Sequence, residues 1–376
     1  MEGILEMNIL QELKDLEEKE DLSVQLKQQN RPLVMWGAGE IAEEVNHYLQ
    51  MNNISLADVF VDDEYYSEGE LFDGKRVISC SMLEEKYTSV DVILGCSNYE
   101  KISLLEKIEV VHKVFYLFSY SYGIYNKTPL SEIEENIHEF QKIYNMLADE
   151  LSCKNYLAFL KTRISGNNSY ILNIFKNETN YFNNDIFHIN DREVFVDIGA
   201  YDGDTIRLFL NENNGHFKYI YALEPDQTSR SMLEGYVQRS DLQNVMIEGK
   251  IPWREKGKLV FASKDNGQLS SLVFNDDNLM EGNESAILAE PLDEMFEYTE
   301  YVTLIKINYL EGAKEALQGA KNILRVHKPK LAISVGFDCT NIRSLLMLIK
   351  EINPEYKLYL RYNRGTISTL TCYGVI

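Results

Sequence analysis

Short apolar runs alternate with helical patterns through the second half of the chain. The runs lie near 194–198, 219–223, 245–247, 258–262, 302–307, 330–335, 357–361 and 367–374. Apolar runs of this length are typical of buried strands. Helical patterns follow the first runs and recur near 312–326 and 340–350. Strands that alternate with helices favour a doubly wound α/β domain, which we place over 189–376.

The first half shows the same organisation on a smaller scale. Strands are predicted at 33–36, 58–61, 76–78 and 91–95, with a helix after the first of them. This predicts a small Rossmann-like α/β domain over 31–120. Before it, residues 1–30 carry leucine and isoleucine at helical spacing among Glu and Lys. We expect an N-terminal helix there, which either packs on its own domain or serves as a docking or dimer helix.

Residues 121–188 have a mostly helical pattern. Ser131 and Glu134 have the spacing of a capping box, and apolar residues follow at helical intervals. A second helix is predicted at 151–163, ended by Gly166 and the two asparagines after it. We expect this segment to join the two α/β domains, and it could also line a substrate pocket.

A glycine-rich turn follows the predicted strand at 194–198. The residues that form it are Asp197, Gly199, Tyr201, Gly203, Asp204 and Thr205. Glycine at such a turn lets the backbone approach a bound ligand closely. The alternative is that the two glycines only satisfy the geometry of a tight turn between strand and helix.

An acidic residue ends the next predicted strand. Glu224 follows Asp197 by 27 positions, and Asp226 comes two residues later. In a strand–turn–helix–strand unit, an acid about 20 residues after the turn can accept hydrogen bonds from ribose hydroxyls. The second half is therefore predicted to hold a nucleoside.

The first half carries a weaker version of the same signal. Gly37 and Gly39 open a helix directly after a strand, and Asp62 ends the following strand. This GxGxxA pattern predicts a second nucleotide site. Here too, the glycines could serve the turn alone.

Composition narrows the function. The chain has 376 residues, 45% of them hydrophobic, and a formal net charge of −22. The acidity disfavours nucleic acid and anionic membranes as partners, and no apolar run is long enough to span a bilayer. The five cysteines lack CxxC spacing and the six histidines form no metal-ligand pair. We therefore expect a cytoplasmic protein of two or three domains without a metal.

Residues 190–376 resemble the FkbM family of S-adenosylmethionine-dependent methyltransferases. The blocks that carry the resemblance occur in order at 195–205, 222–225, 250–253, 270–272, 291–294, 304–313, 317–320, 329–334 and 358–361. The resemblance implies a class I methyltransferase that binds S-adenosylmethionine. It also implies O-methylation of a hydroxyl on a sugar or sugar-containing metabolite, with a small molecule or glycan as acceptor. The cofactor would be held by the turn from Asp197 to Thr205 and by Glu224 and Asp226.

The residues expected near the acceptor lie at or after the ends of late strands. They are Lys306, Asn308, Glu311 and Asp338. An alcohol acceptor gains from a base or a polarising group, and ligands of open α/β sheets bind at this edge. Glu311 could instead be an acid that favours a helix N-terminus. Lys306 falls in a buried strand, where a cation needs a partner or must face the pocket.

Two departures from the family pattern leave the activity open. Asn308 stands where the family usually has Asp, and Val335-Gly336-Phe337 replaces a common Tyr-His pair. These departures are consistent with a methyltransferase for an unusual acceptor. They are also consistent with a protein that binds the cofactor, or assembles with partners, without transferring a methyl group. The first half resembles small nucleotide-binding domains of sugar-modifying enzymes at Trp36–Ala42, Val61–Asp63 and Phe72–Ile78. Whether the chain forms a homo-oligomer stays open.

Overall fold

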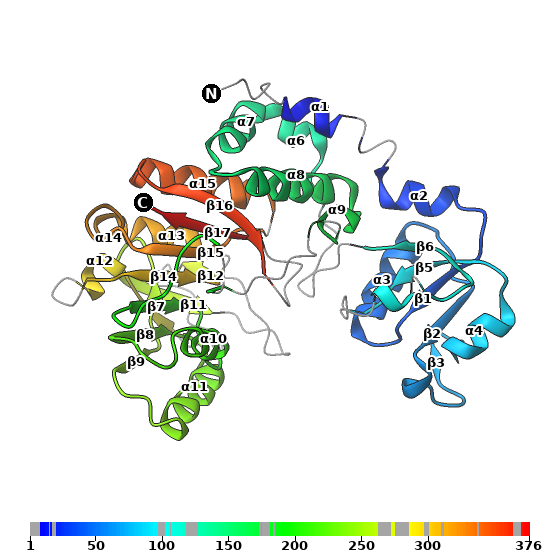
Figure 1. Cartoon of the computed structure of the whole chain (residues 1–376), viewed down its shortest axis with the longest axis horizontal. Coiled ribbons are helices and arrows are strands. Elements are labelled where there is room, and N and C mark those ends of the chain that lie inside the picture. Colours follow the sequence, from blue (N-terminus) through cyan, green and yellow to red (C-terminus); the bar gives the residue numbers. More distant parts are fainter. Residues whose placement is uncertain are drawn as a thin grey trace. The chain divides into compact units, whose positions relative to one another are not determined.

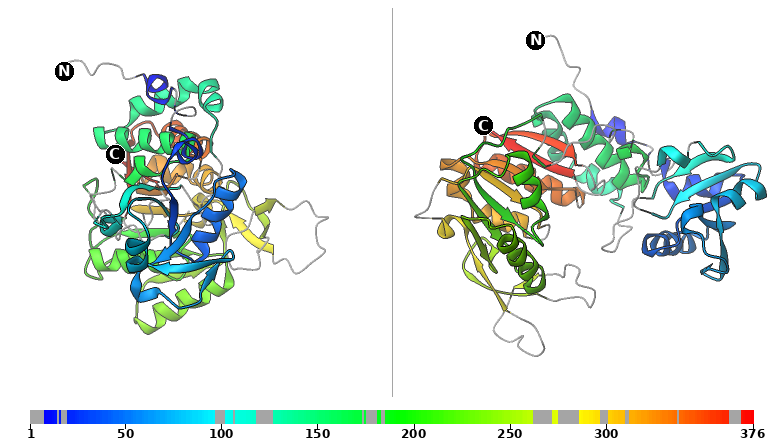
Figure 2. Two further views of the ribbon diagram at one scale, coloured as in Figure 1. Left: turned by 90° about the vertical axis from the view of Figure 1, so that its right-hand side faces the viewer. Right: turned by 60° about the horizontal axis from the view of Figure 1, so that its bottom comes forward.

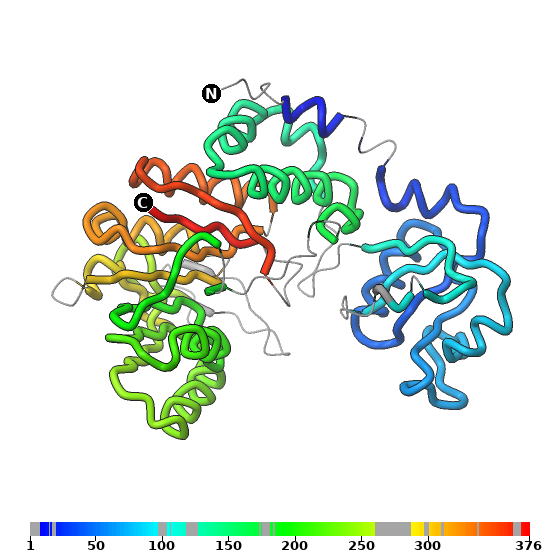
Figure 3. The backbone as a smooth tube through the Cα atoms, viewed as in Figure 1, coloured from blue at the N-terminus to red at the C-terminus, as the bar shows by residue number. Residues whose placement is uncertain are grey.

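The structure is a computed structural model that describes most of the chain, and Figure 3 draws the remaining segments in grey. It describes residues 8–14, 16, 20–96, 102–105, 107–117, 127–172, 174, 181–182, 185–261, 272–274, 286–296, 301–309, 312–336, 338–363 and 370–376. The chain divides into two compact units. Unit 1 comprises Met1–Ile137 and Leu157–Ile174, and unit 2 comprises His138–Tyr156 and Phe175–Ile376. The helical segment 121–188 thus contributes to both units.

Unit 1 is built on a six-stranded sheet with the order β3-β4-β2-β1-β5-β6. The strands are β1 (Leu33–Trp36), β2 (Asp58–Val61), β3 (Leu71–Phe72), β4 (Lys75–Ser79), β5 (Val90–Leu94) and β6 (Val111–Phe115). Only the short hairpin strand β3 is antiparallel to its neighbour; the other pairs are parallel. The helical elements are α1 (Ile9–Leu13), α2 (Leu22–Gln28), α3 (Glu40–Met51), η2 (Asp63–Tyr65), α4 (Cys80–Lys86), α5 (Ile102–Leu105), α6 (Leu130–Glu135) and α9 (Ser169–Leu172).

Helices cover both faces of this sheet (Figure 1), because its strands are apolar on both sides. Met35, Val59 and Ile93 share a buried cluster with side chains of α2 and α3. Their neighbours Val34 and Phe60 belong to a second cluster, which includes Leu83 of α4 and Leu105 of α5. Successive residues of a strand point to opposite faces of the sheet, so each of these strands contributes side chains to both clusters.

Unit 2 is built on a seven-stranded sheet with the order β16-β17-β15-β14-β7-β8-β9. The strands are β7 (Val194–Ile198), β8 (Tyr219–Leu223), β9 (Val245–Glu248), β14 (Leu304–Ile307), β15 (Lys330–Ser334), β16 (Lys357–Tyr362) and β17 (Leu370–Val375). All pairs are parallel except those of β17, which runs antiparallel between β15 and β16. A four-stranded sheet contains β10 (Ile251–Pro252), β11 (Gly257–Phe261), β12 (Leu272–Phe274) and β13 (Ala286–Glu290).

Helices also lie on both faces of the seven-stranded sheet (Figure 2). On one face, Phe195 and Ala222 pack with Phe209 of α10 (Asp204–Glu212) and Leu233 of α11 (Gln227–Arg239). The other helices of this unit are α7 (Ile137–Met146), α12 (Leu292–Met295), α13 (Ala313–Gln318), α14 (Lys321–Val326) and α15 (Cys339–Ile352). Helix α8 (Glu150–Ser165) belongs to both units, because the division falls between Tyr156 and Leu157. The predicted α/β class with two doubly wound sheets is therefore confirmed.

Several predicted helix details are wrong. The capping box at Ser131 does not form, because α6 already begins at Leu130 after Pro129, whose φ of −56° suits a helix start. The predicted helix 312–326 is two helices, since α13 ends at Gln318 and α14 begins at Lys321. A side chain at Gly319 would place its Cβ 2.0 Å from the Trp253 carbonyl oxygen. The described part of segment 1–30 holds two short helices, α1 and α2, in place of one.

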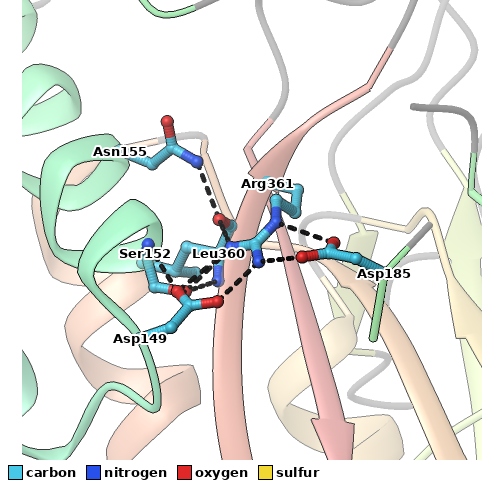
Figure 4. Close-up of polar contacts among 6 residues, drawn as sticks. All are labelled: Asp149, Ser152, Asn155, Asp185, Leu360 and Arg361. Carbon is cyan, nitrogen blue, oxygen red and sulfur yellow. Dashed lines mark hydrogen bonds and ion pairs between the residues drawn. The ribbon is translucent and has the colours of Figure 1, made fainter. Parts of the chain in front are cut away.

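A buried arginine ties the start of α8 to the edge of the sheet in unit 2 (Figure 4). The Arg361 guanidinium on β16 donates to the Asp149 carboxylate at 2.6 Å, to the Asp185 carboxylate at 3.1 Å and to Ser152 Oγ at 3.0 Å. The backbone N–H of Leu360 donates to Ser152 Oγ, and the Asn155 amide donates to the Leu360 carbonyl. Burial opposes the charge, but the two carboxylates raise the pKa of Arg361 above its ordinary value.

This cluster predicts a measurable loss of stability on substitution. Arg361→Met removes the cation between two carboxylates, which then repel each other. We expect unfolding free energy to fall by roughly 2 kcal/mol, less than for a fully buried pair because both carboxylates reach solvent. Chemical denaturation followed by circular dichroism measures this loss. Lys154→Met is the control, since its pair with Glu150 is exposed; an equal loss in both variants would contradict the assigned role.

Candidate functional site

The candidate site lies at the carboxyl edge of the sheet in unit 2, where the strand order reverses. After β7 the chain continues to β8 on one side, while β14 pairs with β7 on the other. In open α/β sheets such a switch point leaves a crevice between the two connecting loops, and ligands bind there. Three loops meet at this edge: those that follow β7, β8 and β14.

Close contact between two of these loops explains the first glycine. Gly199 has a φ of +73°, and a Cβ on it would lie 2.7 Å from the Asn308 carbonyl oxygen after β14. Gly203 caps α10 with a φ of +90°, and a Cβ there would lie 2.9 Å from a methyl group of Leu233. The predicted turn geometry is therefore present, and both glycines are required by packing. Between them, Tyr201 has a φ of +49° and a side chain that is 57% exposed.

A buried ion pair joins the same two strands. Lys306 Nζ on β14 lies 2.8 Å from Asp197 Oδ1 on β7, and the side chains are 1% and 0% exposed. The same ammonium donates to the Gly199 carbonyl at 2.9 Å. Within the described residues, neither oxygen of Asp197 has a hydrogen-bond donor of good geometry. Lys306 thus has the partner expected of a buried cation, and it bridges the strand and the turn that follows it.

Burial dominates the electrostatics of this pair. It raises the pKa of Asp197 to about 6, even though the Lys306 ammonium favours the charged carboxylate. For Lys306 burial favours the neutral amine, but the Asp197 charge prevails and the pKa is raised. An ammonium held in this way is not available as a base toward an acceptor.

Glu224 links the loop after β8 to the glycine turn. Its Oε2 accepts the backbone N–H of Tyr201 at 2.8 Å, and its Oε1 accepts that of Asp226 at 2.9 Å. Burial raises the pKa of Glu224, while these two backbone donors act in the opposite direction. Each oxygen accepts one of these N–H groups, and a carboxylate oxygen has room for a second donor. The carboxylate can therefore hold the turn and still receive a ligand hydroxyl.

The other predicted cofactor residues mainly support helix starts. Asp226 caps α11 by accepting the Ser229 N–H at 2.7 Å. Asp204 begins α10, and its carboxylate accepts the Thr205 N–H at 2.7 Å. Thr205 itself is buried. The Thr205 hydroxyl also donates to the Asp204 carboxylate at 3.3 Å. All three residues therefore lie beside the turn and form hydrogen bonds at the starts of their helices.

The residues expected near the acceptor have separate contacts in the structure. Asn308 is exposed after β14, with its backbone N–H bonded to Ile198. Asp338 caps α15 by accepting the Asn341 N–H at 2.6 Å. Glu311 and Phe337 lie outside the described residues. Of these candidates, Lys306 and Asp338 already have structural partners.

Sequence reasoning missed hydroxyl groups at the same edge of the sheet. Ser334, the last residue of β15, is buried 3.5 Å from the hydroxyl of Tyr181. Next to it, Thr371 of β17 accepts from the Asn363 amide at 2.7 Å, and Asn363 in turn accepts from Tyr373 at 2.8 Å. Of these residues, only Ser334 could have been predicted, because it ends a strand that the sequence indicates. Asn363 and Thr371 come together only through the antiparallel register of β16 and β17.

The glycine turn of unit 1 is explained largely by packing. Gly37 has a φ of +113°, and a Cβ there would lie 2.6 Å from the Gly95 carbonyl oxygen. Gly39 caps α3 and has open space beside it. Asp62, at the end of β2, accepts a hydrogen bond from the Trp36 indole at 3.1 Å. The acid expected near a ribose is therefore engaged by a side chain of its own unit.

No cluster of three or more potential metal ligands occurs among the residues that the structure describes. In the same part of the chain, no helix combines the length and apolar character needed to cross a bilayer. All five cysteines are free thiols.

Comparison with solved structures finds the same fold along nearly the whole chain. Methyltransferase FkbM from Methylobacillus flagellatus KT matches with a TM-score of 0.70 and 19% identity, over 97% of this chain and 98% of that chain. An rRNA methylase from Streptococcus thermophilus matches with a TM-score of 0.32 and 14% identity, over 50% of this chain and 88% of its own. A precorrin-6y C5,15-methyltransferase from Geobacter metallireducens GS-15 matches with a TM-score of 0.32 and 10% identity, over 50% and 81%. No family model and no curated protein matches the sequence.

The ion pair predicts strong coupling between two substitutions. Asp197→Asn leaves a buried ammonium without its counter-charge, and Lys306→Met leaves a buried carboxylate, so each is expected to cost about 3–5 kcal/mol of unfolding free energy. The double variant removes both charges and should cost less than the sum of the two. Denaturation of all four proteins gives the coupling energy. Additive losses would show that the two charges do not stabilise each other.

Proposed function

We propose that this chain is an S-adenosylmethionine-dependent methyltransferase. The observation that carries the proposal is the carboxylate of Glu224, which is held at the switch point by the N–H groups of Tyr201 and Asp226. An acid at this place in the fold suits the two hydroxyls of a ribose. The glycine turn beside it lies at the same edge of the sheet.

The order of strands supports a methyltransferase over a dinucleotide-binding enzyme. We number the seven strands of the unit 2 sheet in chain order, with β7 as strand 1 and β17 as strand 7. Across the sheet, from β9 to β16, their order is then 3-2-1-4-5-7-6, and strand 7 is antiparallel to its neighbours. A dinucleotide-binding sheet reads 3-2-1-4-5-6 and lacks this inserted strand. The whole-chain likeness to the Methylobacillus methyltransferase points the same way.

The residues present fit the proposed cofactor at three positions. Glu224 would accept from the ribose, the turn from Gly199 to Gly203 would follow the amino-acid end, and Asp226 would lie near the adenine. Asp197 would keep the turn in place through Lys306. When bound, the cofactor supplies an activated methyl group on a sulfonium, so the task of the protein is to place the acceptor in line with it.

The acceptor is proposed to be a hydroxyl of a sugar or sugar-containing metabolite, small or part of a glycan. This follows from the family resemblance of the second half and from the sugar-enzyme resemblance of the first. Unit 1 would hold a nucleotide at Gly37, Gly39 and Asp62. The free thiols fit a reducing compartment, for which the cytoplasm is proposed.

Cofactor binding tests the proposal directly. Isothermal titration with S-adenosylmethionine is expected to show one saturable site. Glu224→Gln keeps an acceptor for one backbone N–H but loses the charge that receives ribose hydroxyls, so affinity should fall at least tenfold, about 1.4 kcal/mol. Glu212→Gln, the same change on the exposed end of α10, is the control. An absence of saturable binding by the wild type would contradict the proposal.

A second candidate is a protein that binds the cofactor without transferring the methyl group. The observation that favours it is the state of the expected acceptor residues: Lys306 is held in an ion pair, Asp338 caps a helix and Asn308 cannot accept a proton as Asp does. Such a protein would keep the cofactor fold for binding or assembly.

Turnover separates the two candidates. A methyltransferase converts S-adenosylmethionine to S-adenosylhomocysteine in the presence of sugar acceptors, and liquid chromatography detects the product. If Asn308 marks an altered but active site, Asn308→Asp should change the rate while cofactor affinity stays the same. If the wild type and the Asn308→Asp variant both bind S-adenosylmethionine tightly but form no product with a broad panel of acceptors, the non-catalytic candidate would be supported.

A further inference from the structure

Tyr201 holds a backbone conformation that a tyrosine rarely adopts. Its φ is +49°, in the left-handed region. Among the described residues, seven other than glycine have a positive φ, and five of these seven are Asn or Asp. Asn and Asp reach this region more readily than other L-residues, because their short polar side chains can hydrogen-bond locally. A tyrosine has no such advantage, so its surroundings must hold it there.

Contacts on both sides of Tyr201 hold this conformation. The Tyr201 N–H donates to Glu224 Oε2 at 2.8 Å. The next residue, Asp202, is held by Arg207, whose guanidinium donates to the Asp202 carbonyl at 3.1 Å and to its carboxylate at 2.8 Å. The guanidinium carbon of Arg207 in turn lies 5.1 Å from the centre of the Tyr236 ring. The backbone of the turn is therefore fixed around the tyrosine by contacts within unit 2.

The ring of Tyr201 gains no packing from this arrangement. The residue is 57% exposed, and within the described part of the chain its ring has no aromatic or cation–π partner. Backbone strain that the surroundings enforce is characteristic of functional sites. Here the strained residue leaves an aromatic side chain in solvent at the carboxyl edge of the sheet, where ligands of this fold bind. A contact between the ring and a bound ligand accounts for both the strain and the exposure.

Charges around the turn indicate which part of a ligand the ring suits. Asp197 is paired with Lys306 at 2.8 Å, and Asp202 is paired with Arg207 at 2.8 Å. Two carboxylates of the turn are thus already neutralised by cations of the protein itself. The face of an aromatic ring attracts a cation although the ring carries no charge. Tyr201 therefore provides a cation-binding surface beside two acids that are already occupied.

We propose that the ring of Tyr201 binds the sulfonium of S-adenosylmethionine. This inference rests on the proposed function, in which the amino-acid end of the cofactor follows this turn. The ammonium of that end can donate hydrogen bonds, whereas a sulfonium has no N–H or O–H group to donate. An aromatic face suits such a cation, as it suits quaternary ammonium groups. Because the sulfur of S-adenosylhomocysteine is neutral, Tyr201 would favour the cofactor over its demethylated product.

Calorimetric titration of the full chain with S-adenosylmethionine and with S-adenosylhomocysteine tests the contact. Tyr201→Asn removes the ring and keeps a residue that accepts the left-handed backbone. We expect its affinity for S-adenosylmethionine to fall about fivefold, as for loss of a cation–π contact, and its affinity for S-adenosylhomocysteine to change by less than about twofold. Tyr201→Phe keeps the ring and should retain both affinities. Tyr301→Asn is the control, because it removes a similarly exposed tyrosine before the amino end of β14.

Thermal unfolding without ligand separates a lost contact from a lost fold. Tyr201→Asn should melt no lower than the wild type, and Tyr201→Gly, which suits the same backbone, should repeat its binding result. Equal losses for both ligands, no loss for either, or a loss in Tyr201→Phe would overturn the sulfonium contact and leave the proposed function standing. If the wild type binds neither ligand, the proposed function fails and this inference fails with it.

Discussion

The contact between Lys306 and Asp197 is the constraint on which the site depends. Two charges this deeply buried are costly unless each has its partner. The pair fixes β14 against β7 at the place where the strand order reverses, and the bond from Lys306 to the Gly199 carbonyl extends the constraint into the turn. From the sequence, Lys306 is a candidate catalytic residue, but in the structure it holds the strands and the turn of the site together.

Contacts of backbone groups then hold the loops of the site together. Gly199 lets the turn after β7 pass within contact of the loop after β14, and Glu224 draws the loop after β8 onto the same turn. Each of the three loops is therefore held by at least one contact to another. A site made this way is organised before any ligand arrives, which lowers the ordering cost of binding.

The sequence predicted the main strands of both sheets and the positions of the glycine turns, because buried parallel strands read as short apolar runs. The strands at 194–198 and 219–223 have the predicted bounds. Contacts between distant segments were beyond this reasoning. Arg361 meets Asp149 and Asp185, which are 212 and 176 positions away, and no local pattern marks such a pair. Asp226 and Asp338 have N-cap bonds that depend on where each helix begins.

The central claim is that Asp197, the glycine turn and Glu224 form one adenosyl-binding crevice in unit 2. A crystal structure grown with S-adenosylmethionine tests it most directly. The account predicts ligand density at the carboxyl ends of β7 and β8, with a ribose hydroxyl within hydrogen-bond distance of the Glu224 carboxylate. Cofactor density elsewhere in the molecule, or a crevice filled by a side chain of the protein itself, would contradict it.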